Sequence, residues 1–137
     1  MTAPTLPAAE AAALARIPDC EQVDLLLPDM NGLLRGKRIT RSALEKVYAD
    51  GVCLPMSLIA TDITGNTVEE TGLGYAIGDE DRICRPVPGT LRPVPWQPEV
   101  AWCLGEAWTL DGQEHWPSCP RAKPPPASSR WAAAPAN

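Results

Sequence analysis

Residues 21–60 have the sequence EQVDLLLPDMNGLLRGKRITRSALEKVYADGVCLPMSLIA, and this stretch decides the fold. Apolar residues alternate at every second position over residues 23–27, which is the period of a β-strand. The cluster Pro28–Gly32 that follows holds turn residues, including an Asn-Gly pair. Within the return segment, Gly36 indicates a bulge or the close approach of another backbone. The first half of the stretch therefore predicts a β-hairpin.

The second half of the stretch predicts one helix. Leu44, Val47 and Tyr48 lie at helical spacing and form one apolar face. Thr40 is suited to begin this helix as an N-cap, and Gly51 is suited to end it.

Further extended segments complete the predicted domain. Residues 52–60 form a strand that Pro55 breaks or confines to an edge, and residues 82–96 are extended and hold four prolines. Residues 99–110 alternate in the manner of a strand, and an Asp-Gly turn follows them. This order of elements predicts an α+β domain of the β-grasp (ubiquitin-like) type, with about four strands packed on one helix.

The loop between these strands concentrates the negative charge of the chain. Residues 62–81 hold six acidic side chains and no Lys or Arg, which gives −6 against −5 for the whole chain. Such a loop at a strand end is suited to hold a cation, whether ammonium, an amine or a metal. A solvated acidic loop without a ligand explains the composition too, and composition alone favours it. The GxGxxxG spacing of its glycines is not that of a nucleotide-binding loop.

The return strand of the predicted hairpin is basic, because it carries Arg35, Lys37 and Arg38. A charged edge strand that resists aggregation explains this pattern better than a ligand site does.

The length, net charge and residue counts of the chain limit the class of protein that it can be. A chain of 137 residues forms one domain with or without tails, and its net charge of −5 argues against nucleic-acid binding. No apolar run approaches the length of about 18 residues that a membrane span needs. Five cysteines without a CxxC pair, together with one histidine, favour reduced thiols in a cytoplasmic protein over a zinc site.

We expect three regions along the chain. Residues 1–19 form an Ala-rich leader with a short helix, and residues 20–114 form the domain. Residues 115–137 are expected to be a disordered tail, because the segment from residue 117 onward holds six prolines, six alanines and no acidic residue. A frameshift or an interrupted gene would produce such an abrupt change in composition.

Three segments resemble the N-terminal β-grasp domain of the glutamine synthetase family, and most of all its γ-glutamylpolyamine (γ-glutamylputrescine) synthetase branch. They are VDLLLPDMNGLLRGKRI (23–39), LEKVYADGVCLPMSLIATDITGNTVEETG (44–72) and GDEDRICRPVPGTLRPVPW (78–96). The blocks TDITGN and DEDR…VPGTL…VPW carry most of the resemblance, which covers about residues 23–113.

The resemblance implies an activity in nitrogen metabolism. The family uses ATP and Mg²⁺ or Mn²⁺ to ligate glutamate to ammonia or an amine through a γ-glutamyl phosphate. Its members form ring homo-oligomers, in which the N-terminal domain completes the active site of a neighbouring subunit. Their larger catalytic domain carries the ATP and metal sites, and nothing in this chain resembles it. The chain alone is therefore expected to bind neither cofactor and to be inactive.

The resemblance also assigns a site. Asp62 matches the aspartate of the family's Phe-Asp-Gly-Ser-Ser loop, which binds and deprotonates ammonium. Ile63 and Thr64 stand where Gly and Ser are expected, and this departure fits an amine larger than ammonia. A carboxylate beside the amine stabilises the bound cation and can accept its proton. The further substrate-loop candidates are Thr64, Asn66, Glu69 and Glu70.

Two other functions remain open on the sequence. The chain could be a stand-alone β-grasp interaction module that docks on a glutamine synthetase catalytic domain or on another partner. It could also be a small polyamine-binding protein that uses its acidic loop.

Overall fold

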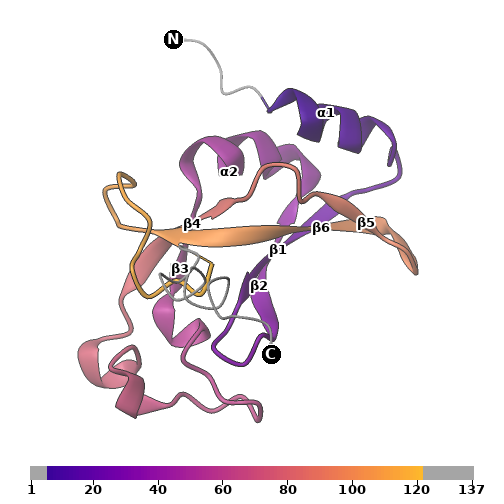
Figure 1. The fold of residues 1–137 in the computed structure, drawn as a ribbon. Helices are drawn as coiled ribbons and strands as arrows, with labels where there is room; N and C mark the ends of the chain where they lie inside the picture. Colours follow the sequence, from indigo (N-terminus) through magenta and orange to yellow (C-terminus); the bar gives the residue numbers. More distant parts are fainter. Residues whose placement is uncertain (1–5, 122–137) are drawn as a thin grey trace, which may run out of the picture.

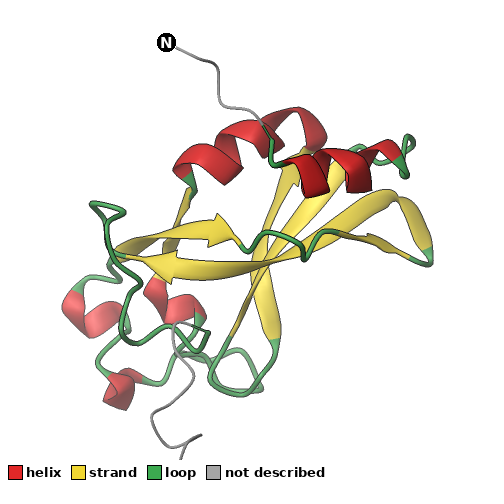
Figure 2. Ribbon diagram, turned by 45° about the horizontal axis from the view of Figure 1, so that its top comes forward, coloured by secondary structure: helices red, strands yellow, loops and turns green. Residues whose placement is uncertain are grey.

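The computed structural model describes residues 6–121 and shows a twisted β-sheet with two α-helices on one side (Figures 1 and 2). The helices are α1 (Ala8–Ala15) and α2 (Leu44–Asp50). The strands are β1 (Gln22–Pro28), β2 (Leu34–Thr40), β3 (Val52–Pro55), β4 (Asp81–Pro86), β5 (Arg92–Val94) and β6 (Gln97–Trp108). Their order is β2-β1-β6-β4-β3, and β5 pairs with β6. The predicted α+β class is therefore confirmed.

The strand count differs from the four that were expected, because the sheet has six strands. Both additional strands lie in the Pro-rich segment 82–96, which was predicted only to be extended. Its prolines are compatible with pairing because of where they fall. Pro86 is the last residue of β4, and Pro93 lies in the three-residue β5.

Strand β1 lies at the centre of the core. It pairs antiparallel with β2 and parallel with β6, and the side chains of Val23, Leu25 and Leu27 are fully buried. Burying each such side chain contributes about 1.5–3 kcal/mol. Leu44 and Val47 of α2 belong to the same core, as the predicted apolar face of the helix requires.

Gly36 allows β2 to approach β1 closely, as the sequence indicated. A Cβ atom at this position would lie 1.7 Å from the carbonyl oxygen of Leu25. No side chain other than hydrogen fits there without a shift of the strand.

The turn before α2 differs in detail from the prediction. Thr40 precedes a 3-10 turn, Arg41–Ala43, and its hydroxyl contacts that of Ser42 at 3.1 Å and caps no backbone N–H group. Gly51 ends the helix with φ 76°, as predicted.

The N-terminal segment is packed against the core. Leu6 and Leu14 join the core, and the buried carboxylate of Glu10 accepts a hydrogen bond from the backbone N–H of Gly89. The guanidinium of Arg41 donates to the carbonyl oxygens of Leu14, Ile17 and Cys20, at the end of α1 and beyond it. The carbonyls of Leu14 and Ile17 also accept from the N–H groups of Ile17 and Cys20, so Arg41 adds a second donor to each.

The packed chain also continues past residue 114, where the tail was expected to begin. Trp116 is buried with the guanidinium of Arg82 5.5 Å from its ring centroid, and Cys119 is buried with its Sγ accepting from the N–H of Ala107. Two residues of this Pro-rich segment thus reach the core. The remaining part of the expected tail, residues 122–137, lies outside the described residues.

All five cysteines are free thiols, and four of them are buried. Burial raises the pKa of Cys84 and of Cys103 to about 12, so both stay protonated at neutral pH. Between residues 6 and 121, no helix is both long and apolar enough to cross a membrane.

We predict that Gly36→Ala destabilises the domain by at least about 2 kcal/mol, because the new Cβ atom would collide with the Leu25 carbonyl. Lys37→Ala, at the next and exposed position of β2, is the control and should change stability by less than about 0.5 kcal/mol. Urea unfolding of the 137-residue chain measures both effects. Equal stability of the two variants would contradict the close approach.

Candidate functional site

Asp62 closes a tight turn with its own carboxylate. Its Oδ1 accepts from the N–H of Thr64 at 2.8 Å, from the Thr64 hydroxyl at 2.6 Å and from the N–H of Asn66 at 3.0 Å. The Asn66 side-chain amide donates to the Thr64 hydroxyl oxygen at 2.9 Å. Gly65, between them, has φ 95°, a backbone angle that glycine adopts without strain. Three of the predicted site residues, Asp62, Thr64 and Asn66, therefore form one unit.

These hydrogen bonds keep Asp62 charged. The Thr64 hydroxyl, followed by the N–H of Asn66, holds the pKa of the Asp62 carboxyl below its usual value of 3.8. At neutral pH the group is a carboxylate with Oδ1 fully engaged. Its Oδ2 has no hydrogen-bond partner within residues 6–121, so this oxygen is the one able to accept a cation.

The tip of the β1–β2 hairpin holds the chain that leads into this turn. The N–H of Met30 donates to the carbonyl of Ile59 at 3.1 Å, and the Asn31 side chain donates to the carbonyl of Thr61 at 2.9 Å. In Figure 1 the hairpin tip and this loop lie together at the lower end of the molecule. Segments about thirty residues apart are thus joined.

Asp29, which the sequence analysis missed, organises the hairpin tip. Its side chain is fully buried and accepts from the N–H groups of Asn31 and Leu33 at 2.8 and 2.9 Å and from Nε of Arg35 at 2.8 Å. Burial acts to raise the pKa of this carboxyl, but the hydrogen bonds from Arg35 and the two backbone groups outweigh it and lower the pKa. An aspartate in a turn cluster, here PDMNG, is the signal that could have identified it.

Arg35 reaches the Asp62 turn with its other nitrogen. Nη2 donates to the backbone carbonyl of Asp62 at 3.1 Å. Arg35 therefore differs from Arg38, which pairs with Asp24 through two hydrogen bonds and is about half exposed, at 46%. The predicted solvated basic edge describes Arg38 and not Arg35.

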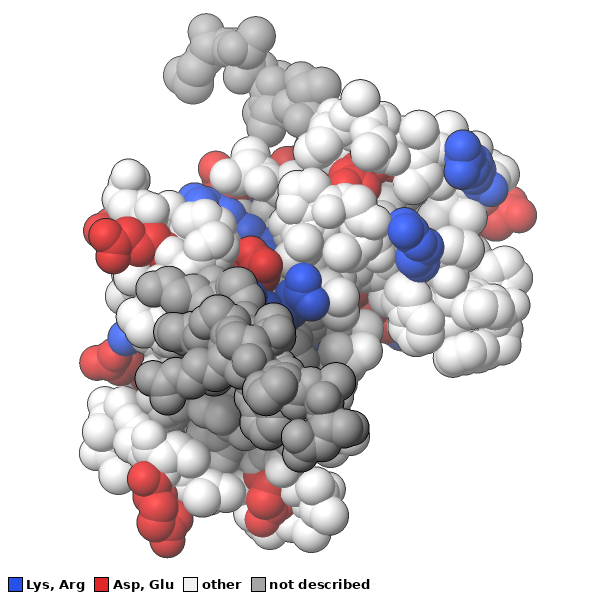
Figure 3. Space-filling model, viewed as in Figure 1, with Lys and Arg blue, Asp and Glu red and all other residues white. Residues whose placement is uncertain are grey.

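The predicted glutamates are not joined to the Asp62 turn by hydrogen bonds. Glu69 folds back on its own loop and accepts from the N–H groups of Tyr75 and Ala76 at 3.0 and 3.1 Å. Glu70 is exposed and makes no hydrogen bond among the described residues. The acidic side chains at the lower end of the molecule stand apart, with uncharged surface between them (Figure 3).

Two other acids of the loop also serve its own structure. Asp79 accepts from the N–H of Ser57 at 3.1 Å, and Glu80 pairs with Arg82 at 2.8 Å. In the part of the chain that the structure describes, no group of three His, Cys, Asp or Glu side chains is placed to hold a metal ion.

Exposed apolar side chains lie on the hairpin tip and on the loop that it holds. Met30 and Leu33 at the hairpin tip are 55% and 44% exposed, and Ile63, directly after Asp62, is 75% exposed.

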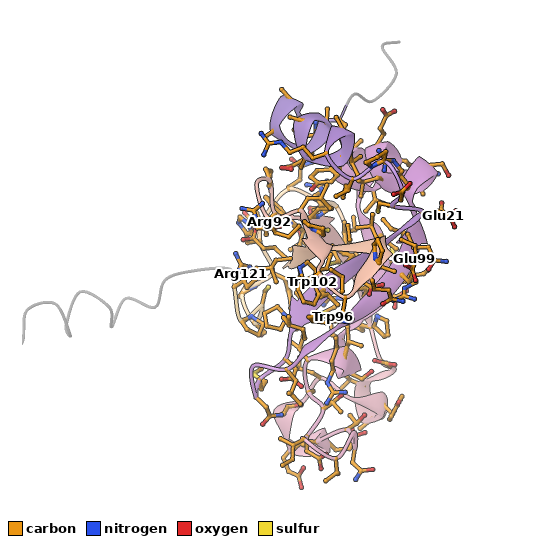
Figure 4. The ribbon with its side chains drawn as sticks, turned by 90° about the vertical axis from the view of Figure 1, so that its right-hand side faces the viewer. Glu21, Arg92, Trp96, Glu99, Trp102 and Arg121 are labelled. Atoms are coloured by element: carbon orange, nitrogen blue, oxygen red, sulfur yellow. The ribbon has the colours of Figure 1, made fainter. Side chains whose placement is uncertain are left out.

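A second apolar surface lies on the sheet. Trp96, which is 74% exposed, packs edge-on against Trp102 at 5.7 Å between ring centroids, close to Arg92 (Figure 4). Beside them is a hollow of about 250 Å³ lined by Leu26, Leu34, Thr90, Arg92, Trp102, Cys103 and Leu104.

Curated relatives match this chain over most of its length. It is 50% identical over 86 residues to gamma-glutamylputrescine synthetase PuuA of Escherichia coli (strain K12). The matched residues make up 63% of this chain and 18% of that protein. It is 37% identical over 115 residues to gamma-glutamylethanolamide synthetase GlnA4 of Streptomyces coelicolor, or 80% of the chain and 24% of that protein. A gamma-glutamylanilide synthase of Acinetobacter sp is 28% identical over 111 residues, with shares of 74% and 22%. The chain thus spans less than a quarter of the length of these relatives.

Solved structures agree on the fold. A GmaS–ADP complex superposes with a TM-score of 0.60 at 22% identity, over 81% of this chain and 23% of the other. A novel glutamine synthase homolog gives 0.61 at 22% identity, over 74% and 24%. No protein-family profile matches the chain.

We predict that Thr64→Val raises the pKa of the Asp62 carboxyl toward its ordinary value, because the hydroxyl donor is lost. Thr67→Val is the matched control, since Thr67 pairs with Thr61 through the backbone, and it should leave that pKa unchanged. Carboxyl chemical shifts followed against pH give both values. An unchanged titration in the Thr64 variant would show that this hydroxyl does not tune Asp62.

Proposed function

We propose, from the premise that this chain belongs to the glutamine synthetase family, that it supplies the amine-site loop of an ATP-dependent glutamate–amine ligase. The observation that carries the proposal is the Asp62 turn. Its carboxylate is charged at neutral pH, and its Oδ2 is unengaged within the described residues. The finer description of the domain as β-grasp fits the parallel pairing of β1 with β6 and the position of α2 over the sheet.

The chemistry requires such a group. An alkyl amine is protonated at neutral pH and must lose a proton to attack a γ-glutamyl phosphate. A fixed carboxylate stabilises the ammonium form on binding and accepts that proton as the nitrogen attacks. Such proton transfer to a positioned side chain typically raises the rate by about 10²–10⁴-fold. Asp62 is the carboxylate that we propose for both roles, binding the ammonium form and accepting its proton.

We propose an amine larger than ammonia as the substrate. Ile63 places an apolar side chain, 75% exposed, next to the carboxylate. An alkyl chain attached to the nitrogen would find a contact there that ammonium cannot use. The named relatives make γ-glutamyl products of several different amines, which supports this class without selecting one of them.

The remaining parts of the site would come from a catalytic domain, in this subunit or in a neighbouring subunit of a ring homo-oligomer. ATP and Mg²⁺ or Mn²⁺ would bind there, and the chain alone would be inactive. The exposed Met30, Leu33 and Ile63 are suited to contact that domain next to the amine site. The same exposed residues also favour one alternative, a stand-alone interaction module that binds a glutamine synthetase catalytic domain without completing a reaction.

We predict that Asp62 controls turnover in a chimera in which the matched 86 residues of this chain replace their equivalents in the E. coli relative. Asp62→Asn keeps an oxygen for the turn but removes the charge, and it should lower kcat/KM for the amine at least ~100-fold. Glu70→Gln, on an exposed acid of the same loop, is the control and should change it by less than about threefold.

Near-normal turnover of the Asp62→Asn chimera would exclude the proposed role. A chimera that assembles with the partner subunits but gains no amine-dependent ADP release, even with Asp62 intact, would favour the interaction module.

A further inference from the structure

We propose that Arg35 is a positioning residue for Asp62, because its guanidinium bridges the buried carboxylate of Asp29 to the backbone carbonyl of Asp62. The proposal rests on the amine-site function of Asp62 given above. It concerns a residue of the hairpin that would act on the amine only through the loop.

The two contacts of Arg35 use different sides of one rigid group. Nε donates to Asp29 Oδ2 at 2.8 Å, and Nη2 donates to the Asp62 carbonyl at 3.1 Å. The planar guanidinium fixes the angle between its N–H groups, so the two acceptors are held at one separation. A lysine ammonium has the charge but not this fork.

The anchor of the bridge is held by several hydrogen bonds. Asp29 is fully buried, and two backbone N–H groups of the hairpin tip hold its other oxygen. The position of Arg35 is therefore set by the core side of the hairpin. In β2, Arg35 is paired with Leu27, whose side chain is fully buried.

The far end of the bridge lies at the functional residue. The Met30 and Asn31 contacts hold Ile59 and Thr61, but among these tethers only Arg35 binds Asp62 itself. A hydrogen bond to the Asp62 carbonyl orients the peptide plane between Asp62 and Ile63. The N–H of Gly65 donates to the same carbonyl at 3.1 Å, and Arg35 adds the link from this carbonyl to the hairpin, so the two bonds together orient the carboxylate and the exposed apolar side chain. Errors of about 1 Å in such a group can cost ~10²-fold in rate.

A simpler role for Arg35 is to neutralise Asp29 and so stabilise the hairpin. Arg35→Lys separates the two roles, because it keeps the positive charge near Asp29 and loses the second arm. Arg38→Lys is the matched control, since Arg38 lies on the same strand and its side-chain hydrogen bonds among the described residues go to Asp24, which is 23% exposed.

The first measurement is the NMR titration of the Asp62 carboxyl in the 137-residue chain. Arg35→Lys should raise its pKa toward the ordinary value, because a loosened turn donates fewer hydrogen bonds to Oδ1, whereas Arg38→Lys should leave it unchanged. Should Arg35→Lys fail to fold, the double variant Asp29→Asn/Arg35→Gln removes both charges and avoids a buried unpaired one. If the Asp62 pKa in the Arg35 variant that folds equals that in Arg38→Lys and in the unaltered chain, the proposal is overturned.

The second measurement uses the chimeric ligase described above. Arg35→Lys should lower kcat/KM for the amine about tenfold or more and leave KM for glutamate within about twofold, a split that a general loss of stability would not produce. Amine kinetics equal to those of Arg38→Lys, in a chimera where Asp62→Asn is inactive, would overturn the positioning role. A chimera in which Asp62→Asn is fully active would instead overturn the proposed function, so the two failures are distinguishable.

Discussion

The carboxylate of Asp29 is fully enclosed, and a buried charge is tolerated only where hydrogen bonds and an opposite charge surround it. Two N–H groups of the hairpin tip and the guanidinium of Arg35 meet this requirement. These hydrogen bonds to Asp29 fix the conformation of the hairpin tip. The tip carries Met30 and Asn31, whose hydrogen bonds hold the loop that leads into the Asp62 turn. One desolvated acid therefore determines where a second, solvent-accessible acid stands thirty-three positions later in the chain.

The sequence predicted the elements whose signals are local. The alternation in β1, the apolar face of α2, Gly51 at its end and Gly36 at the close approach all follow from residue types and spacing. Strands β4 and β5 were missed because prolines argued against pairing, and only the tertiary arrangement shows that they fall at a strand end and in a short strand. The packing of Trp116 and Cys119 was missed because composition reports the average of a segment and not the two side chains that reach the core.

The candidate site shows the same division. Asp62 was found through a resemblance, and its union with Thr64 and Asn66 follows from the preference of aspartate and threonine for bonds to nearby backbone. The concentration of six acids in one loop suggested a shared cation site. In the structure, Glu69, Asp79 and Glu80 instead hold the loop through N–H groups and Arg82. The net charge of a segment does not show whether a carboxylate is free to bind a ligand or already accepts hydrogen bonds from its own backbone. The turn cluster PDMNG points to Asp29, but the contact of Arg35 with the Asp62 carbonyl spans hairpin and loop, so no local pattern reveals it.

The proposed function requires the Asp62 turn to be a fixed part of the folded domain. Amide hydrogen exchange in the intact chain tests it most directly, because the N–H groups of Asp62 and Asn66 both donate within the turn. We expect these two amides to exchange at least about tenfold more slowly than in an unstructured peptide. Exchange at unstructured rates, while the amide of Leu25 in β1 stays protected, would show that the Asp62 turn is not formed in the folded domain.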